Sequence, residues 1–304
     1  MVGGFLVVGE SVADIVRVPG RPDVVHAGGS PANVAYGLAR LGRQAALLTQ
    51  LGTEPVGELI GGHLRTAGVE LLTDGQTGVP TPTAVVTLGP DGQPSYELDV
   101  RWTLADTEVP PPDHLHLGSV SAVLEPGSTA VLAITDRLRA AGATVSYDPN
   151  VRPALLGEPA GARARVERCV AAADLVKASD EDLAWLYPGQ AAHEVAERWL
   201  ALGPAVVLVT RGAAGSAAYT RYVAAEQSAA PAEVVDTVGA GDAFTAAVLD
   251  RLAARGLLGA AARPALAVLD QRELTHLLRY AGRAAALTVS RAGANPPTAA
   301  ELGG

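Results

Sequence analysis

The chain has 304 residues, which is long enough for one large α/β domain or two small ones. Its formal net charge of -9 argues against a general nucleic-acid-binding protein, whose surface should be basic. No apolar run approaches the roughly 20 residues that span a bilayer, and a single cysteine excludes an internal disulfide. These properties predict a soluble, cytoplasmic protein with neither a membrane nor a nucleic-acid partner.

Short apolar runs alternate with helical patterns along most of the chain. Near-continuous apolar strands separated by helices predict a mostly parallel sheet covered on both faces. In chain order, the expected strands are 5–9, 45–51, 115–118, 144–148, 175–178 and 206–210, and the expected helices are 31–41, 56–67, 129–141, 163–173 and 193–202. A hairpin is then expected over 216–223, followed by long helices over 240–254 and 273–290.

Two segments, 11–26 and 83–100, depart from this alternation. Both contain strand-like stretches, with turns at Pro19-Gly20 and Pro90-Asp91-Gly92. We expect them either to pair as a small antiparallel sheet, forming a lid over a site at the strand ends, or to form two separate surface hairpins. The expected organisation is therefore one domain over residues 1–304 with a small β lid.

The most informative motif reads Asp-Thr-Val-Gly-Ala-Gly-Asp and begins at Asp236. Its two glycines, Gly239 and Gly241, stand at the start of an expected helix. Without Cβ atoms, they and the intervening Ala240 can direct backbone N–H groups towards a ligand. Together with the helix dipole, these N–H groups predict an anion hole for a terminal phosphate. No Lys-Ser/Thr pair follows, so the motif is not a P-loop.

Asp242 follows the anion hole directly. A carboxylate in this place repels phosphate unless its role is to accept a proton from the attacking hydroxyl. Phosphoryl transfer needs such a base or orienting group, so Asp242 is the candidate catalytic base. The alternative is that Asp242 only complements the positive end of the helix dipole.

A second glycine motif begins at Gly28-Gly29. Ser30 is the expected N-cap of the next helix and Pro31 its first residue. Asn33 is not needed for the apolar face of that helix, so its amide is free to bind vicinal hydroxyls. The two glycines would give a sugar close access to the backbone. Alternatively, Gly28-Gly29 is only a turn and Asn33 only a solvated residue.

In this order, the two motifs resemble the signatures of the ribokinase-like (PfkB) family of carbohydrate kinases. Within the family, the string from Asp148 to Pro153 and the C-terminal Ser-Arg-Ala-Gly-Ala from Ser290 look most like bacterial fructokinases. Further similarity lies in Gly9-Glu10 followed by Asp14, and in the strings that run from Asp148 to Pro153, Lys177 to Asp182, Thr210 to Gly215 and Ser290 to Pro297. The resemblance covers essentially the whole chain. It implies a three-layer α/β/α fold with a mostly parallel central sheet and a small β lid.

The resemblance also implies an ATP-dependent sugar kinase and assigns its site residues. Sugar hydroxyls are held by Asp14, Gly29 and Asn33, with Gly28 beside them as a further substrate-binding candidate from the glycine pair; the anion hole is Gly239–Gly241, and the base is Asp242. The nucleotide is held by Thr210, Gly212 and Gly215. The family's Asn-x-x-Glu motif reads Ser179-Asp-Glu-Asp182 here, with Ser179 at the nucleotide and Asp182 organising a hydrated Mg²⁺. Asp236 and the backbone of 291–293 match the K⁺ site of some members.

Several alternatives stay open. Arg152 either contacts the substrate or the transferring phosphate, or caps a helix C-terminus. Fructose is the leading substrate, with ribose, 2-keto-3-deoxygluconate or a nucleoside as alternatives, and a catalytically idle sugar sensor as a rival function. The lid string from Tyr96 to Trp102 is more charged than in many fructokinases, and Arg101 faces either an acidic sugar or solvent. Exposed lid edges would allow a homodimer.

Overall fold

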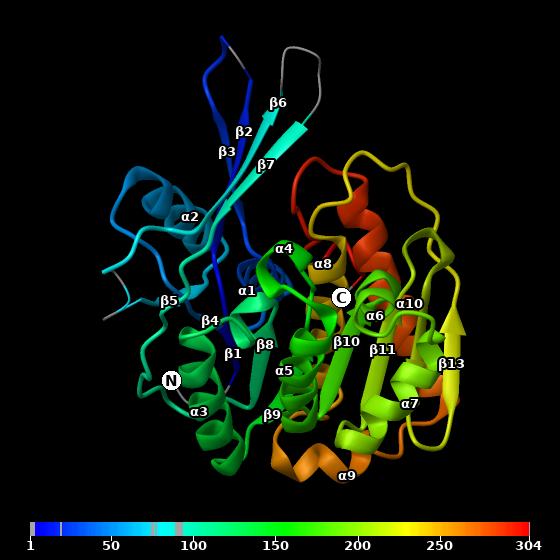
Figure 1. Ribbon diagram of the computed structural model, residues 1–304. Helices are drawn as coiled ribbons and strands as arrows, with labels where there is room; N and C mark the ends of the chain where they lie inside the picture. Colours follow the sequence, from blue (N-terminus) through cyan, green and yellow to red (C-terminus); the bar gives the residue numbers. More distant parts are fainter. Residues whose placement is uncertain (1–3, 19, 74–75, 77, 89–93, 304) are drawn as a thin grey trace.

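The computed structural model describes residues 4–18, 20–73, 76, 78–88 and 94–303 (Figure 1). Pro19 and the expected turn at Pro90-Asp91-Gly92 lie outside these ranges. The described chain forms a large sheet between two layers of helices and a smaller sheet that projects from one end of the large one (Figure 1). This arrangement confirms the expected three-layer α/β/α fold.

The large sheet has the strand order β13-β12-β11-β10-β9-β8-β1-β4-β5. Its strands are β1 (Phe5–Val8), β4 (Ala45–Leu48), β5 (Glu70–Leu72), β8 (His114–Gly118), β9 (Thr144–Asp148), β10 (Leu175–Ser179), β11 (Val206–Thr210), β12 (Ser216–Tyr219) and β13 (Ala224–Gln227). All neighbours from β11 to β5 run parallel, whereas β12 and β13 are antiparallel additions at one edge. The central strands are buried on both faces, which explains the continuous apolar sequences of β1 and β11; β9 is buried as well but also carries Thr144, Ser146 and Asp148.

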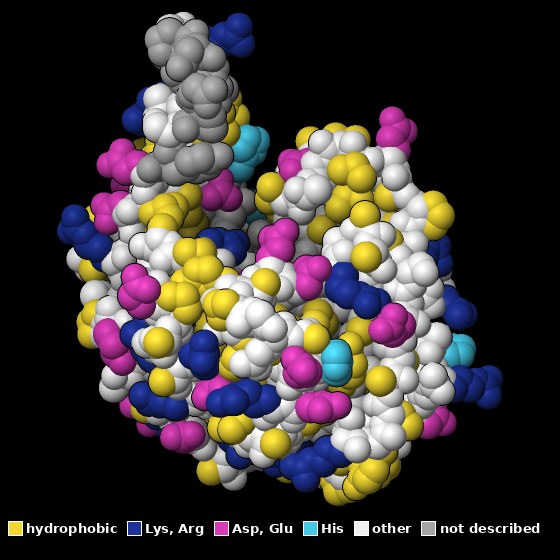
Figure 2. Space-filling model, turned by 45° about the vertical axis from the view of Figure 1, so that its right-hand side comes forward, with side chains coloured by type: hydrophobic (Ala, Val, Ile, Leu, Met, Phe, Trp, Pro, Cys, Tyr) yellow, Lys and Arg dark blue, Asp and Glu magenta, His cyan; other side chains and the backbone are white. Residues whose placement is uncertain are grey.

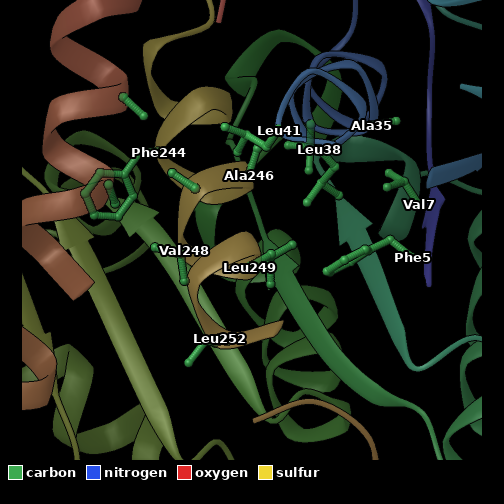
Figure 3. Close-up of a cluster of buried hydrophobic side chains, with 14 of the residues drawn as sticks. Phe5, Val7, Ala35, Leu38, Leu41, Phe244, Ala246, Val248, Leu249 and Leu252 are labelled. Carbon is green, nitrogen blue, oxygen red and sulfur yellow. The ribbon is translucent and has the colours of Figure 1, made fainter. Parts of the chain in front are cut away.

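The helices cover both faces of this sheet. They are α1 (Ser30–Arg40), α2 (Pro55–Thr66), α3 (Gly127–Ala140), α4 (Pro153–Leu156), α5 (Pro159–Ala172), α6 (Asp180–Leu186), α7 (Ala192–Leu202), α8 (Ala240–Ala254), α9 (Arg263–Leu266) and α10 (Gln271–Val289). Residues of α1, α2, α8, α9 and α10 share one apolar core with the sheet, and residues of α3 to α7 share the other. In the first core, Leu38 of α1 lies near Ala246 and Leu249 of α8 (Figure 3).

The small sheet has the order β3-β2-β6-β7, formed by β2 (Val12–Arg17), β3 (Val24–Gly28), β6 (Thr83–Leu88) and β7 (Pro94–Asp99). The two expected lid segments therefore pair with each other rather than forming separate hairpins. The expectation of an antiparallel sheet is correct for β2–β3 and β6–β7 but wrong for β2–β6, which run parallel. The reason is that β2 and β6 both leave the large sheet in the same direction (Figure 1).

Most element boundaries agree with the sequence prediction within a few residues, and 144–148, 206–210 and 240–254 agree fully. The hairpin expected over 216–223 instead extends to Gln227. Ser30 is not the N-cap of α1 as expected. Gly29 occupies that position with a φ of 95°, and Ser30 is the first helical residue. The hydroxyl of Ser30 is therefore not used for capping, and its partner is described below.

His114 and His116 lie on β8 and face the same side of the sheet, as their spacing predicts. Ring nitrogens of both lie 2.8 Å from the Ser146 hydroxyl, and His114 also contacts the Thr144 hydroxyl at 2.9 Å. Burial lowers the pKa of each histidine to about 3; a second, smaller contribution comes from His116 for His114 and from the Lys177 ammonium for His116. Both imidazoles are therefore neutral in the folded protein at pH 7.

These histidines predict a loss of stability in mild acid. Their folded pKa lies below the unfolded value, so the unfolded chain binds more protons between about pH 6.5 and 3 and stability falls as the pH decreases through that window. From pH 7 to pH 5 we expect a loss on the order of 2 kcal/mol for each histidine. Urea unfolding at the two pH values measures it.

The control for this prediction is the double variant His114→Gln/His116→Gln, which keeps polar side chains but cannot titrate. Burial raises the pKa of the Glu10 carboxyl, so protonation of Glu10 stabilises the folded protein as the pH falls. This contribution is present in both the wild type and the double variant and does not affect their comparison. An equal pH dependence in wild type and double variant would contradict the assignment.

Candidate active site

A cavity of about 900 Å³ lies where the carboxyl ends of the parallel strands meet the small sheet. The space-filling view shows the corresponding hollow between the small sheet and the rest of the molecule (Figure 2). Ligands of parallel α/β sheets bind at this edge, because the strand-to-helix loops converge there. All the predicted site residues line the cavity except Gly28 and Asp236, whose neighbours in the sequence, Gly29 and Thr237, do line it.

The N-terminus of α8 forms part of the cavity wall. Its N-cap, Gly239, has a φ of 76°, and a Cβ at this position would come within 2.6 Å of the Ala294 Cβ. Only glycine therefore fits both the backbone conformation and the available space. The first-turn N–H groups of a helix have no intrahelical partners, so this end of α8 presents donors and the positive end of the helix dipole to the cavity.

The Asp242 carboxylate lies in the first turn of α8 and is held by two side chains of α1. The Ser30 hydroxyl donates to Asp242 Oδ1 at 2.6 Å, and the Asn33 amide donates to Asp242 Oδ2 at 2.8 Å. The structure thus brings the two glycine motifs of the sequence together. Asp242 does more than complement its own helix, since donors from a second helix fix both of its oxygens.

A buried lysine lies beside the same turn. Lys177 Nζ donates to Asp148 Oδ2 at 2.8 Å, and it lies 3.0 Å from where a Cβ on Gly241 would stand. Burial acts to lower the pKa of Lys177, but the carboxylates of Asp148, Asp182 and Asp242 act in the opposite direction and prevail, so this pKa is raised. Burial raises the pKa of Asp148 to about 6. At neutral pH the pair is therefore ionic, with a cation next to the anion hole.

The wall towards the small sheet contains Asp14 and Gly29, and Gly28 packs against Asp14. A Cβ on Gly28 would come within 2.0 Å of Asp14 Oδ2, and a Cβ on Gly29, whose φ is 95°, within 2.5 Å of the Glu10 carbonyl oxygen. The two glycines are thus required by close packing, and Gly29 leaves its backbone at the cavity wall. Burial raises the pKa of Asp14.

The two predicted metal ligands are largely engaged with the backbone. Asp182 accepts from the N–H groups of Val151 and Ser179 at 2.8 and 2.9 Å, the second as part of the capping box of α6. Asp236 accepts from Val238 and Gly293, and these two bonds lower its pKa. Among the described residues, no three His, Cys, Asp or Glu side chains gather as a metal site would require. Asp182 still lines the cavity, and each of its oxygens has a further lone pair.

Arg152 and the nucleotide-loop residues occupy the rim of the cavity. Arg152 is the N-cap residue of α4 and donates to the Asn150 side chain at 2.8 Å, so the alternative that it caps a helix C-terminus is wrong. Thr210, Gly212 and Gly215 lie at the end of β11 and in the turn that follows it. Arg101 pairs with Asp99 and its side chain is 68% exposed, which agrees with a solvated lid face.

Three charged residues without a predicted role are buried at the cavity or beside it: Lys177, Asp148 and Glu10. The signal that could have identified them is a charged residue within or directly after an apolar strand. Such residues are rarely buried unless they are paired. Glu10 accepts from the Ser121 N–H at 3.3 Å, and the neighbouring Ser119 has a φ of 60°, which is uncommon for a residue other than glycine.

Comparisons with known proteins agree with this geometry. Residues 6–301 match the model of the pfkB family carbohydrate kinases. The chain is 34% identical over 270 residues to a fructokinase of Klebsiella pneumoniae, covering 84% of this chain and 87% of that protein. The structure of a Xylella fastidiosa fructokinase with bound ATP superposes with a TM-score of 0.84 at 30% identity, over 98% of this chain and 96% of that one. The structure of a Vibrio cholerae fructokinase with fructose, ADP and calcium superposes with a TM-score of 0.81 at 27% sequence identity, over 98% of this chain and 97% of that one. The chain therefore belongs to the pfkB family of carbohydrate kinases and is a phosphotransferase.

Proposed function

We propose that this sugar kinase transfers the γ-phosphoryl group of ATP to a primary hydroxyl of fructose, with Asp242 as the general base. The observation that carries the proposal is the position of Asp242, an oriented carboxylate in the first turn of the helix whose N–H groups face the cavity. In one continuous cavity, a proton acceptor thus stands beside an anion-binding turn, as phosphoryl transfer requires.

In this proposal the sugar lies on the side of the small sheet. Asp14 and Asn33 offer polar groups to its hydroxyls, Gly28 and Gly29 keep the backbone close, and Arg152 stands at the rim. The whole chain acts as one kinase domain, with the small sheet as a lid whose closure excludes water and limits hydrolysis of ATP.

The nucleotide lies on the other side of the cavity. Ser179, Thr210, Gly212 and Gly215 line this part, together with the small apolar side chains of Ala230, Val234 and Ala286. The γ-phosphate is directed at the turn of Gly239, Ala240 and Gly241, where the Lys177 ammonium adds positive charge. Fixed donors and cations of this kind stabilise the charge that develops on the transferring phosphoryl group.

Two carboxylates are the proposed ligands of Mg²⁺ and K⁺. Asp182 would hold a hydrated Mg²⁺, because it lines the cavity and each of the two oxygens that accept from the backbone keeps a lone pair. When bound, this ion would neutralise phosphate charge. Asp236, ionised through its two backbone hydrogen bonds, would hold K⁺ together with carbonyl groups of 291–293.

The test is ADP release from ATP with Mg²⁺ and K⁺ over a panel of fructose, ribose, 2-keto-3-deoxygluconate and nucleosides. We expect the highest kcat/KM with fructose, and NMR of the product should place the phosphate on a primary carbon. A higher kcat/KM with another member would replace fructose as the substrate. Sugar binding without turnover on any member would favour the idle sensor.

A further inference from the structure

Ser30 is placed to control the geometry of the proposed base. Its hydroxyl is buried and donates to Asp242 Oδ1 at 2.6 Å across 212 positions of sequence. The other carboxylate oxygen, Oδ2, accepts from Asn33 at 2.8 Å, and that contact is only partly buried. Both donors line the cavity, but the partner of Oδ1 is buried, whereas the partner of Oδ2 is only partly buried.

We infer that Ser30 is a positioning residue that anchors Oδ1, so that Oδ2 is the oxygen that accepts the proton. This inference rests on the proposed function. In the transfer step, the sugar hydroxyl oxygen forms a bond to the γ-phosphorus while its proton passes to Asp242 Oδ2. The bond from the γ-phosphorus to the bridging oxygen breaks, and its electron pair leaves with ADP.

Ser30 becomes the main partner of the Asp242 carboxylate when a sugar is bound. Asn33 has one amide group, and a sugar hydroxyl entering between Asn33 and Oδ2 would compete for it. The Ser30 hydroxyl is the more buried of the two donors, although Ser30 also lines the cavity, so an entering sugar competes first for Asn33. During transfer, Ser30 is thus the side chain that keeps the carboxylate from rotating. A general base must keep such an orientation, because small displacements from the reacting atom slow the reaction strongly.

The close packing of α1 against α8 brings the Ser30 hydroxyl within hydrogen-bonding distance of Asp242. Gly37 of α1 lies so close to α8 that a Cβ on it would stand 2.9 Å from the Ala246 Cβ. Figure 3 shows Ala246 of α8 near Leu38 of α1 and Leu41, the C-cap residue of α1, with the two helices side by side. This close contact lets the N-termini of the two helices converge on Asp242. A residue larger than glycine at position 37 would separate them.

The test compares Ser30→Ala with Ser11→Ala. Ser11 is a matched control, because its hydroxyl is also buried, bonds to Thr49 at 3.0 Å and does not line the cavity. We expect Ser30→Ala to slow single-turnover phosphoryl transfer by about 10- to 100-fold, with the KM of sugar and ATP changed less than about threefold. Ser11→Ala should retain the wild-type rate, and Ser30→Thr, which keeps the hydroxyl, should recover part of the lost rate.

A double-mutant cycle tests whether Ser30 acts through the carboxylate. In an Asp242→Asn background, Ser30→Ala should cause little further loss, because the group that it positions is no longer a base. A full additional loss in that background would overturn the inference, as would a wild-type transfer rate or a changed KM alone in Ser30→Ala. In each of these cases the proposed function stands if Asp242→Asn is inactive. Full turnover by Asp242→Asn would instead overturn the proposed function.

Discussion

Asp242→Asn is expected to lower kcat by about 10²- to 10⁴-fold, the usual contribution of a general base. The asparagine side chain has the same shape and can still accept the Ser30 hydrogen bond through its carbonyl oxygen. It cannot take the proton of the attacking hydroxyl at neutral pH. Folding and nucleotide binding should therefore be nearly unchanged, which a thermal midpoint and ATP titration would show beside the steady-state kinetics.

Asp136→Asn provides the matched control for this experiment. Asp136 is an exposed residue of α3 that does not line the cavity, so its substitution removes one carboxylate without touching the site. We expect wild-type kcat for Asp136→Asn. If Asp242→Asn kept wild-type kcat with fructose, the carboxylate would be only a structural partner of α1, and another group would have to accept the proton.

Lys177→Met is expected to impair both stability and catalysis. The substitution leaves Asp148 buried without its cation, and breaking a buried ion pair in this way costs about 3–5 kcal/mol. It also removes the positive charge next to Gly241, and the loss of one such group slows transfer by roughly 10²- to 10³-fold. Urea unfolding and single-turnover transfer measure the two effects separately.

The double variant Lys177→Met/Asp148→Asn separates these two roles. Without the unpaired carboxylate, most of the lost stability should return. The asparagine oxygen can still accept the hydrogen bond that the Asn150 N–H donates to Asp148 in the wild type. The transfer rate should stay low, because the cation is still missing. Recovery of both stability and rate in the double variant would mean that the ion pair supports only the fold.

The sequence alone was sufficient for the features whose cause is local. The strand over 206–210 is a short apolar run between turns, and the helix over 240–254 begins at a glycine pair, so both were predicted to the residue, as was the more polar strand over 144–148. Local patterns also selected the two glycine motifs, whose catalytic and binding roles stay predictions. The capping box of Ser179 and Asp182 also has a local signature, a serine followed three residues later by a carboxylate, although the sequence analysis considered only its ligand role.

Only the tertiary structure decided which of these residues meet. Ser30 and Asp242 are 212 positions apart, and their contact depends on the strand order and on the close packing of Gly37 against Ala246. The parallel pairing of β2 and β6, like the Lys177–Asp148 ion pair, joins segments brought together by the fold. The periodicity of apolar residues in a helix or strand predicts which face of the element is buried, but it does not predict which other element covers that face. For this protein, the sequence therefore determined the elements and the motifs, and long-range packing determined the active-site geometry.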